Sequence, residues 1–390
     1  MDTFDAVIVG GGPAGSTCAW RLRRAGLSVA VLDRAVFPRD KVCAGWITPA
    51  VVDLLALDIE QYRQHRVLQP ITAFRTGLQG SSEVETRYEE PVSYGIRRCE
   101  FDHYLLQRSG ARLRCGESVA DLRRVDGRWI INGDIATPVL IGAGGHFCPV
   151  ARRLNPQHPG HVVVATLEME LALSDRQFAR VNVAPDTPVL HFCEDLKGYG
   201  WCVRKGNFLN IGLGRQDPHG LPGRVQAYVA FLISRQIVPN DLPTQFRGHA
   251  YLLADSSPRQ CVADGVLLVG DAAGLADPRS GEGIRPAIES GLLAASAILG
   301  AQGRYDRSEL EPYRQLLKAR YATSGGADAL GQSLPSWLVR ALARGAMRSR
   351  WFTRHVVLDR WFLGRHRPAL SIGRVERPPV TTNVLARRAG

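Results

Sequence analysis

A glycine-rich turn near the N-terminus has the residue types and spacing that bind a nucleotide pyrophosphate. It follows the G-x-G-x-x-G pattern: Gly10 permits the tight turn, Gly12 lets the backbone approach the phosphates, and Gly15 lets helix and strand pack closely. The pyrophosphate is then expected at the helix N-terminus, where unpaired N–H groups favour an anion. The expected cofactor-binding residues of this turn are Gly10, Gly12, Pro13, Ala14 and Gly15.

Asp33 supplies the acidic residue that completes this pattern, eighteen residues after Gly15. Its carboxylate can accept both hydroxyls of an adenosine ribose, and its charge repels a 2′-phosphate. A lone glycine pattern is weak, but here a strand, a helix and a second strand ending in an acid form one βαβ unit over residues 4–33. This half-site therefore favours FAD or NAD over NADP.

Two further apolar strands also end in glycine, at Gly142 and Gly270. The three corners are expected along one edge of a parallel sheet, where a doubly wound fold binds its ligand. Asp271 follows the third corner and can accept hydrogen bonds from a ribityl chain. The glycine-rich segment 277–284 begins another helix, whose N-terminus would stabilise negative charge on the N1–C2=O edge of a reduced flavin.

These elements predict an α/β protein with a doubly wound parallel sheet that binds FAD, an interleaved β-rich substrate domain and a helical C-terminal segment. At 390 residues the chain exceeds the usual size of one domain. We expect the FAD-binding domain in residues 1–69, 96–155 and 257–325, the substrate domain in 70–95 and 156–256, and a basic helical segment in 326–390.

The composition, with 45% hydrophobic and 22% charged residues, is that of an ordinary globular protein. No run reaches transmembrane length, and the first strand leaves no room for a signal peptide, so a cytoplasmic location is expected. Eight cysteines form no C-x-x-C pair, which argues against a metal site and a disulfide framework. The net charge of +12 comes mostly from arginine and lacks an RNA-binding signature, so no nucleic-acid partner is expected.

Taken together, these motifs resemble the FAD-dependent geranylgeranyl reductase family, within the larger class that holds aromatic hydroxylases and flavin halogenases. The resemblance spans residues 1 to about 300. The matching pieces are residues 10–15, 37–45, Arg98, 142–152, 199–201 and 270–284.

The resemblance implies a non-covalent FAD, with Asp33 on its ribose and Asp271 on the ribityl-pyrophosphate. Arg39 and Arg98 would lie near the phosphates or the ribityl chain. The segments Cys43–Gly45 and Gly281–Ile284 would flank the isoalloxazine ring. The further cofactor-binding residues expected are Arg34, Cys43, Ala44, Gly45, Gly144, Gly270, Gly281, Gly283 and Ile284.

Three departures from the family pattern concern the flavin ring, the nicotinamide contact and the substrate cavity. Ala44 replaces a glycine of the family's Cys-Gly-Gly element, and Gly144-Gly145 replaces an Asp-Gly element that bears on any nicotinamide contact. The Tyr-x-Trp-x-Phe-Pro-Lys element keeps Tyr199, Trp201 and Lys205 but has Val-Arg in place of Phe-Pro, which alters the expected cavity shape.

Cys43, Tyr199 and Trp201 are the candidate catalytic or pocket residues. A thiol at Cys43 can relay a proton or control access to the flavin; the alternative is an inert buried cysteine. Tyr199 and Trp201 share one face of a strand, where they wall an apolar pocket or serve as ordinary core aromatics. Both interpretations stay open at this point.

A single dinucleotide fingerprint leaves no separate NAD(P)H domain, so NADPH or NADH would bind transiently or an electron-donor protein would reduce the flavin. The favoured function is reduction of a carbon–carbon double bond of an apolar, prenyl-like substrate by hydride from N5 of reduced FAD. One alternative is a monooxygenase that hydroxylates an aromatic substrate through a flavin hydroperoxide. Another is a flavoprotein that carries electrons to a partner or quinone.

The C-terminal segment combines a basic stripe, Arg340, Arg344 and Arg348, with the apolar residues Leu338, Leu342 and Trp351. Helices of this kind commonly lie on anionic membranes. Alternatively, the apolar face docks on the catalytic domain. The sequence therefore allows either a peripheral membrane contact or a docked helix.

Overall fold

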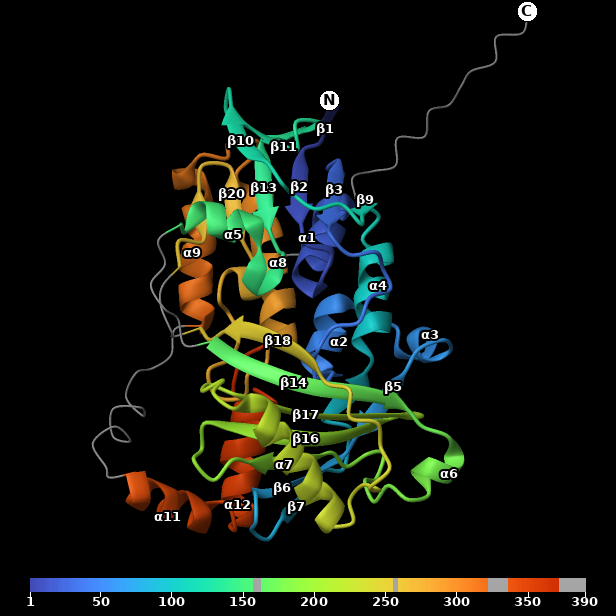
Figure 1. Ribbon diagram of the computed structural model, residues 1–390. Helices are drawn as coiled ribbons and strands as arrows, with labels where there is room; N and C mark the ends of the chain where they lie inside the picture. The colour runs from blue at the N-terminus through green and yellow to red at the C-terminus, as the bar shows by residue number, and fades with distance from the viewer. Residues whose placement is uncertain (157–162, 255–258, 322–335, 372–390) are drawn as a thin grey trace, which may run out of the picture.

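A mostly parallel sheet of short strands, with one antiparallel pair at its edge, forms the upper half of the molecule in Figure 1. The computed structural model describes residues 1–156, 163–254, 259–321 and 336–371. Ala6–Val9 at the centre of this sheet is buried on both faces, as parallel strands covered by helices are. The strand order is β19 (Val262–Ala263), β20 (Val266–Leu268), β13 (Val139–Gly142), β2 (Ala6–Val9), β3 (Val29–Asp33) and β9 (Arg112–Cys115).

Helices cover this sheet, and two of them pack unusually closely. A Cβ at Gly291 of α8 would lie 2.4 Å from the carbonyl oxygen of Ala14 in α1, so the two helix backbones touch there. The predicted doubly wound α/β fold is confirmed. The helices around the sheet are α1 (Pro13–Arg24), α4 (Arg98–Arg108), α5 (Pro149–Leu154), α8 (Ile284–Gly300) and α9 (Arg307–Tyr321).

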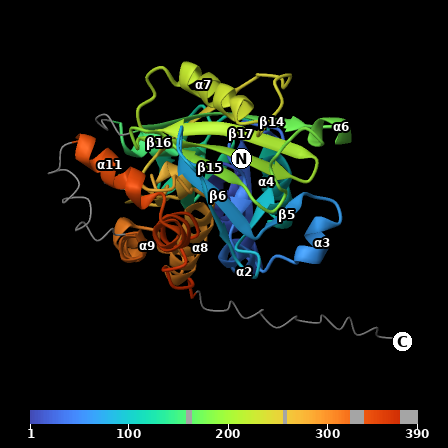
Figure 2. The same cartoon turned by 90° about the horizontal axis from the view of Figure 1, so that it is seen from below.

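A larger, mostly antiparallel sheet forms the lower half. Strands from residues 73–87 join it beside strands from residues 163–252, so two distant parts of the chain build one sheet. Helix α7 (Leu221–Ser234) covers one face, as Figure 2 shows. The strand order is β18 (Arg247–Leu252), β14 (Val163–Ala172), β17 (Phe208–Arg215), β16 (Gly198–Lys205), β15 (Val189–Phe192), β6 (Ala73–Leu78) and β7 (Val84–Arg87).

Two small sheets and several short helices complete the described parts. Strand β8 (Ser93–Ile96) belongs to one of the small sheets and not to the large one. The strand order of the first small sheet is β1 (Asp2–Thr3), β12 (Ile135–Thr137), β11 (Arg128–Ile131) and β10 (Leu122–Val125). The strand order of the second is β4 (Trp46–Ile47), β8 and β5 (Leu68–Ile71). The short helices are α2 (Pro49–Leu55), α3 (Ile59–Arg63), α6 (Asp175–Phe178), η1 (Gly145–Phe147) and η2 (Gly270–Ala272).

The described C-terminal residues are helical, as predicted, but their parts differ in packing. Helix α11 (Ser336–Ala346) is followed by α12 (Arg350–Phe352) and the π-helix η3 (Thr353–Phe362). From η3, the side chains of Val357, Leu358 and Phe362 are buried against the large sheet. The π-helix η3 is thus docked, whereas Leu342 and Trp351 of the preceding basic segment, for which docking is the alternative to membrane contact, are exposed. Residues 326–335 and 372–390 lie outside the described residues.

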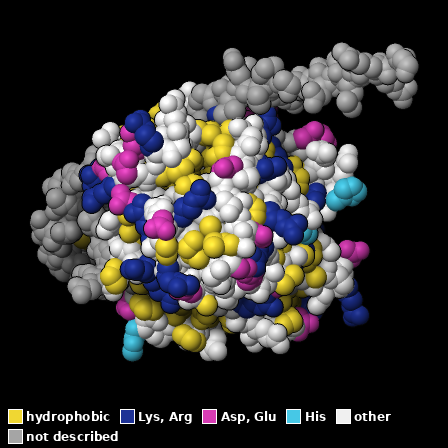
Figure 3. Space-filling view, turned by 90° about the horizontal axis from the view of Figure 1, so that it is seen from above, with side chains coloured by type: hydrophobic (Ala, Val, Ile, Leu, Met, Phe, Trp, Pro, Cys, Tyr) yellow, Lys and Arg dark blue, Asp and Glu magenta, His cyan; other side chains and the backbone are white. Residues whose placement is uncertain are grey.

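Charges of both signs cover the upper end of the molecule. In Figure 3, Lys and Arg side chains lie among acidic ones and apolar patches on that face. The surplus of +12 is therefore not gathered into one basic patch there. Among the helices of the described ranges, none combines the length and apolar character needed to cross a bilayer.

Candidate functional site

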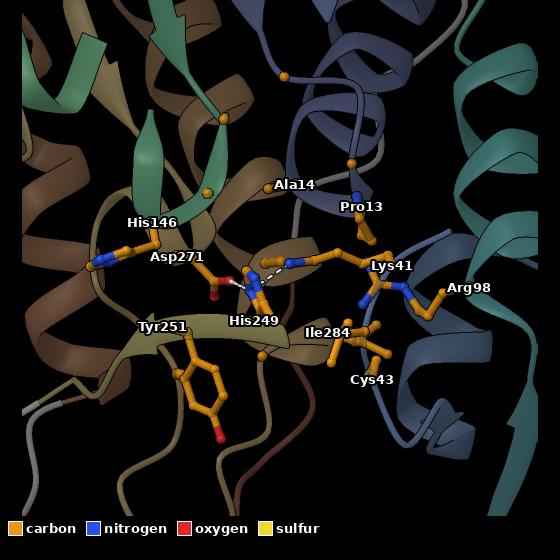
Figure 4. Close-up of a pocket in the computed structure, with 18 of the residues that line it drawn as sticks. Pro13, Ala14, Lys41, Cys43, Arg98, His146, His249, Tyr251, Asp271 and Ile284 are labelled. Carbon is orange, nitrogen blue, oxygen red and sulfur yellow. Dashed lines mark hydrogen bonds and ion pairs between the residues drawn. The ribbon is translucent and has the colours of Figure 1, made fainter. Parts of the chain in front are cut away.

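A cavity of about 610 Å³ lies where the carboxyl ends of β2, β3 and β13 face the large sheet. Ligands bind at this edge in doubly wound folds. Figure 4 shows several of its lining residues. The predicted site residues that line the cavity are Gly10, Gly12, Pro13, Ala14, Asp33, Arg34, Arg39, Cys43, Ala44, Gly45, Arg98, Gly144, Tyr199, Trp201, Asp271, Gly281, Gly283 and Ile284.

Gly15 and Gly270, in contrast, do not line the cavity. A Cβ on Gly15 would lie 2.0 Å from the Gly10 carbonyl oxygen, so this glycine lets α1 pack on its own turn. Gly270 has a φ of +57°, and its N–H donates to Ser290 Oγ at 2.9 Å. Both glycines therefore shape the backbone of the corners, and neighbouring residues form the surface of the cavity.

The first glycine corner has the geometry of a phosphate cradle. Gly10 has a φ of +119°, and a Cβ there would lie 2.3 Å from the carbonyl oxygen of Ala143, so the first and second corners touch. Gly12 caps the N-terminus of α1, and the nearest atom to a Cβ there would be Arg39 Nη2 at 3.6 Å. An anion on this turn therefore meets backbone N–H groups, the helix dipole and a guanidinium.

Asp33 closes the opposite side of the same turn. Its carboxylate accepts hydrogen bonds from the N–H groups of Gly11 and Ala35, at 2.8 and 2.9 Å. These bonds fix the carboxylate at the end of β3, beside the cavity. A charged acceptor held in this way suits ribose hydroxyls.

The basic side of the cavity is built around the fully buried Asp102. Arg98 forms a bidentate pair with it at 2.8 and 2.9 Å, and Arg39 Nη1 lies 3.3 Å from the same carboxylate. Although burial disfavours the charged guanidinium, Asp102 outweighs it, so the pKa of Arg98 is raised. Two arginines sharing one carboxylate leave positive charge for an anionic ligand.

Lys41 and His249 extend the polar side, although neither was among the predicted site residues. Lys41 Nζ lies 2.5 Å from His249 Nε2, which lies 4.0 Å from Asp271 Oδ2 (Figure 4). Burial lowers the pKa of Lys41 to about 8 and also lowers the pKa of His249. Burial alone would raise the pKa of Asp271, but His249 and Lys41 lower it. Asp271 is therefore an ionised acceptor.

Aromatic side chains form the apolar wall of the cavity. Tyr199 and Trp201 line it together with Phe362 of η3, whose ring centroid lies 5.1 Å from that of Tyr199. The Tyr199 hydroxyl donates to the Ser280 carbonyl oxygen at 2.6 Å, and Trp201 Nε1 donates to Asn210 Oδ1 at 2.7 Å. Trp201 is a buried core residue and Tyr199 packs, partly buried, against the same core; both also line the cavity.

Lys205 positions the loop that carries Cys43. It is fully buried, pairs with Glu170 at 2.6 Å, and donates to the carbonyl oxygens of Ala44 and Ile96 at 3.1 Å. A Cβ on Gly45 would lie 2.5 Å from the Ile96 carbonyl oxygen and 2.7 Å from Lys205 Nζ. The lysine at the end of the Tyr-x-Trp element thus clamps the loop and does not line the cavity.

Glu282 is a further lining residue that the sequence did not single out. Burial raises its pKa to about 7, and its Oε1 is buried without a hydrogen-bond partner in the described part of the chain. Glu168 of β14 also has its pKa raised to about 7 by burial but is absent from the lining. Glu282 is thus a carboxyl group of the cavity lining whose pKa burial raises toward neutral pH.

These residues fit FAD. The glycine cradle and the basic side match a pyrophosphate, Asp33 matches a ribose, and the helix α8 N-terminus lies beside Asp271, since a Cβ on its N-cap Gly283 would lie 3.3 Å from Asp271 Oδ1. No group of three or more His, Cys, Asp or Glu side chains in the described ranges is arranged to hold a metal ion.

Comparison with known proteins gives matches of the same kind. Residues 5–99 match the family model described as FAD dependent oxidoreductase. The chain is 30% identical over 331 residues to a menaquinone reductase of Mycobacterium tuberculosis, covering 76% of this chain and 77% of that protein. It is 29% identical to the geranylgeranyl diphosphate reductase of Rhodobacter capsulatus, covering 76% and 75%.

Solved structures share the fold. A geranylgeranyl bacteriochlorophyll reductase-like protein from Thermoplasma acidophilum has a TM-score of 0.68 at 19% identity, covering 89% of this chain and 88% of that one. The halogenase PltM in complex with phloroglucinol and FAD has a TM-score of 0.66 at 19% identity, covering 90% and 78%. The sequence matches and the cavity lead to one conclusion: the chain belongs to the geranylgeranyl reductase family of FAD-dependent oxidoreductases.

Proposed function

We propose that this protein reduces a carbon–carbon double bond of an apolar, prenyl-like substrate. The observation that carries the proposal is one cavity in which a phosphate cradle, a basic side and an aromatic wall meet. Relatives are named as reductases of geranylgeranyl compounds and of menaquinone. An aromatic wall beside a cofactor site suits such substrates better than polar ones.

The proposed cofactor map assigns each end of FAD to one group of residues. Asp33 and the Gly10–Gly15 turn hold the adenosine and pyrophosphate, with Arg39, Lys41 and Arg98 neutralising the phosphates. Asp271 accepts from the ribityl hydroxyls, and the N-terminus of α8 stabilises negative charge at the ring. When bound and reduced, FAD supplies the hydride.

The substrate side works by positioning and by excluding water. Tyr199, Trp201 and Phe362 offer rings to an apolar chain, and the hydrogen bonds of the first two fix their orientation. Lys205 holds the Cys43 loop, which closes the cavity from the other side. Holding the alkene in one orientation supplies a large part of the catalysis in such a site.

Glu282 is the proposed proton donor. Reducing an alkene adds a hydride to one carbon and a proton to the other, so an acid is required. The raised pKa of about 7 keeps a substantial fraction of Glu282 protonated at neutral pH; the residue lines the cavity, and its buried Oε1 has no hydrogen-bond partner in the described part of the chain. The carboxylate left behind takes a new proton from water.

The proposed reductant is NADPH or NADH bound transiently, or a donor protein, because the chain carries one dinucleotide fingerprint.

Product analysis tests the reaction. The FAD-loaded protein is incubated anaerobically with a prenyl compound and each reductant in turn. The molecular mass of the product is then measured by mass spectrometry. A gain of two hydrogens is expected. A hydroxylated product that requires oxygen, or quinone reduction with an unchanged carbon skeleton, would replace the alkene reductase by a monooxygenase or an electron carrier.

Helix α11 and the residues that follow it, up to Trp351 of α12, are the proposed site of contact with an anionic membrane. Leu342 is 58% exposed and Trp351 is 67% exposed, next to the exposed Arg340, Arg344 and Arg348. Exposed apolar side chains flanked by arginines bind the interface of anionic bilayers. Leu334 and Pro335, which open this segment in the sequence, lie outside the described residues. Such a contact would bring the cavity close to membrane-dissolved substrates.

A further inference from the structure

Asn210 of β17 is a buried polar residue between the two sides of the FAD cavity. It is 1% exposed and does not line the cavity itself. Its side chain contacts two residues that do line it, Trp201 of the aromatic wall and Cys43 of the loop between β3 and β4. Trp201 belongs to the large sheet, whereas the Cys43 loop follows a strand of the parallel sheet. Asn210 therefore connects parts of the cavity that different sheets provide.

The hydrogen bonds of Asn210 require a side-chain amide. Trp201 Nε1 donates to its Oδ1 at 2.7 Å. Its Nδ2 donates to the Cys43 carbonyl oxygen at 3.3 Å and to Glu170 Oε1 at 3.4 Å. An indole N–H can only donate, and a carbonyl or ionised carboxylate oxygen can only accept. The residue between them must therefore accept on one side and donate on the other, and the asparagine amide does both.

The backbone of β17 and Asn210 together fix the ring of Trp201. A Cβ on Gly212 would lie 2.3 Å from the indole ring, so the ring packs directly on the strand at this glycine. Asn210 comes two residues earlier, on the same face of the strand, and binds the N–H of the ring. Packing and hydrogen bonding thus hold this part of the aromatic wall in one orientation.

Two backbone carbonyl oxygens hold the Cys43 loop. Asn210 binds the carbonyl oxygen of Cys43, and Lys205 donates to that of Ala44 at 3.1 Å. Glu170 joins the two donors, since its Oε1 lies 2.6 Å from Lys205 Nζ and 3.4 Å from Asn210 Nδ2. Although burial alone would raise the pKa of Glu170, Lys205 lowers it, so this carboxylate is an ionised acceptor. The loop and the aromatic wall therefore share one buried network.

We propose that Asn210 is a positioning residue that sets the distance between the aromatic wall and the Cys43 loop. The inference rests on the proposed function and deepens it, because hydride transfer requires the alkene at one distance and angle from the flavin. Asn210 acts through Trp201 on the substrate side and through Cys43 on the cofactor side. A displacement of about 1 Å in such a site lowers the rate about a hundredfold.

The test replaces Asn210 by leucine, which is similar in size but forms no hydrogen bond. We expect the visible absorbance spectrum of the bound flavin, recorded at saturating FAD, to change in Asn210→Leu because the loop that lines the cavity loses its hold. The Tm should fall as well, since buried polar groups lose their partner. A native flavin spectrum in this variant overturns the proposal.

Tyr228→Phe is the matched control, because it also removes a buried polar contact from the large sheet. Tyr228 is 1% exposed, and its hydroxyl lies 3.2 Å from His191 Nδ1. A Cβ on Gly200 would lie 2.5 Å from its ring, so Tyr228 packs on the face of β16 opposite to Trp201. The control should lower the Tm and keep the native flavin spectrum. The same spectral change in Tyr228→Phe overturns the proposal.

Asn210→Asp is the second variant, which decides the question if Asn210→Leu does not fold. It keeps the size of the side chain and an acceptor for Trp201, but it lacks the N–H groups that bind Cys43 and Glu170. The flavin spectrum should therefore change in this variant too. A native spectrum in Asn210→Asp contradicts the proposed role toward the loop.

Kinetics connect the position of these groups to the reaction. With the prenyl alcohol farnesol, both variants should show a kcat lowered about tenfold or more. Asn210→Asp should keep the native KM, because Trp201 keeps its hydrogen bond, and Tyr228→Phe should keep both constants. A native kcat in a variant with a changed flavin spectrum, or a raised KM with a native kcat, overturns the proposal. The spectra need no turnover, so they remain decisive where the proposed reaction itself fails.

Discussion

Asp271 contacts the other polar groups of the FAD cavity. Its charge raises the pKa of Lys41, which burial lowers, and its Oδ2 lies 4.0 Å from His249 Nε2. Replacing it, Asp271→Asn, removes a charged acceptor for the ribityl chain and leaves Lys41 without its counter-charge. We expect FAD affinity to fall about tenfold or more, because hydrogen bonds to charged groups are worth about 1.5–3 kcal/mol. The ratio of flavin to protein absorbance after gel filtration measures the loss.

The matched control for this substitution is Asp53→Asn, an exposed aspartate on α2 outside the cavity lining. It should keep the flavin content of the native protein. Full flavin occupancy in Asp271→Asn would show that the cofactor map is misplaced at its ribityl end.

Glu282 gives the reaction a predictable pH dependence. Its carboxyl must be protonated to donate, and the raised pKa is about 7, so the rate of alkene reduction should be highest below pH 7 and fall as the pH rises through it. In Glu282→Gln this decline should disappear, together with most of the rate, because an amide is not a general acid. The pH–rate profile of the alkene reduction is the measurement.

Glu168 provides the comparison, because burial raises its pKa to about 7 as well but it does not line the cavity. Glu168→Gln should keep the decline above pH 7. If Glu282→Gln retains the native profile and rate, the proton comes from another group, of which Cys43 or a water molecule is the next candidate.

At the scale of single residues, the sequence predicts the positions where the backbone conformation requires glycine. It misses the site residues that only the fold brings together. Gly10 is predictable because a positive φ and an approach of 2.3 Å to Ala143 allow no side chain. Lys41, His249 and Glu282 come from a loop, a strand of the other sheet and the approach to α8, and no local spacing connects them. The predicted roles of Asp33, Arg34 and Cys43 stay predictions, although all three residues line the cavity.

Helix α1 must lie directly on the turn that precedes it, and Gly15 makes this possible. In Gly15→Ala the new Cβ would meet the Gly10 carbonyl oxygen at 2.0 Å, so the helix or the turn must shift. Overpacking of this kind costs about 1–3 kcal/mol. We expect a lower Tm in thermal unfolding and weaker FAD binding, since the same turn forms the phosphate cradle.

Gly223 of α7 is the control, because a Cβ there would have no atom within 4 Å. Gly223→Ala should leave the Tm unchanged or raise it, as alanine is favoured over glycine in helices by about 0.5–1 kcal/mol. If both substitutions change the Tm alike, the close packing at Gly15 is not a determinant of stability.

Helix α11 and the π-helix η3, with the short α12 between them, differ in how far their apolar side chains are buried. The sequence offered docking or membrane contact for the whole segment, and it could not show that Phe362 reaches the cavity whereas Leu342 stays exposed. Replacing Leu342 and Trp351 together by serine should reduce sedimentation with vesicles of anionic lipid about tenfold or more, because the buried apolar area is lost. The activity on a water-soluble short-chain substrate should not change.

Val125→Ser is the control for the vesicle experiment. Val125 is 49% exposed on β10, at the opposite end of the molecule from α11 (Figure 1). It should sediment as the native protein does. Equal sedimentation of all three proteins would leave α11 without a role in membrane contact.

At the scale of the whole molecule, the cavity beside the glycine corners lies between two sheets, and the chain passes several times from one sheet to the other. The sequence predicts the α/β class and the family, because the strand-glycine corners are local and repeat three times. It does not predict that β6 pairs in parallel with β15, which follows it by more than a hundred residues in the sequence. Nor does it predict that β8 belongs to a small sheet and not to the large one. Those pairings depend on long-range contacts that no local pattern encodes.

The most direct measurement follows the flavin itself. The FAD-loaded protein is reduced without oxygen, mixed rapidly with a prenyl compound, and the return of the oxidised flavin absorbance is recorded. We predict reoxidation at a rate that depends on the concentration of the prenyl compound, with one double bond saturated per flavin. Reoxidation by oxygen or a quinone head group alone, with the prenyl chain unchanged, would contradict the account.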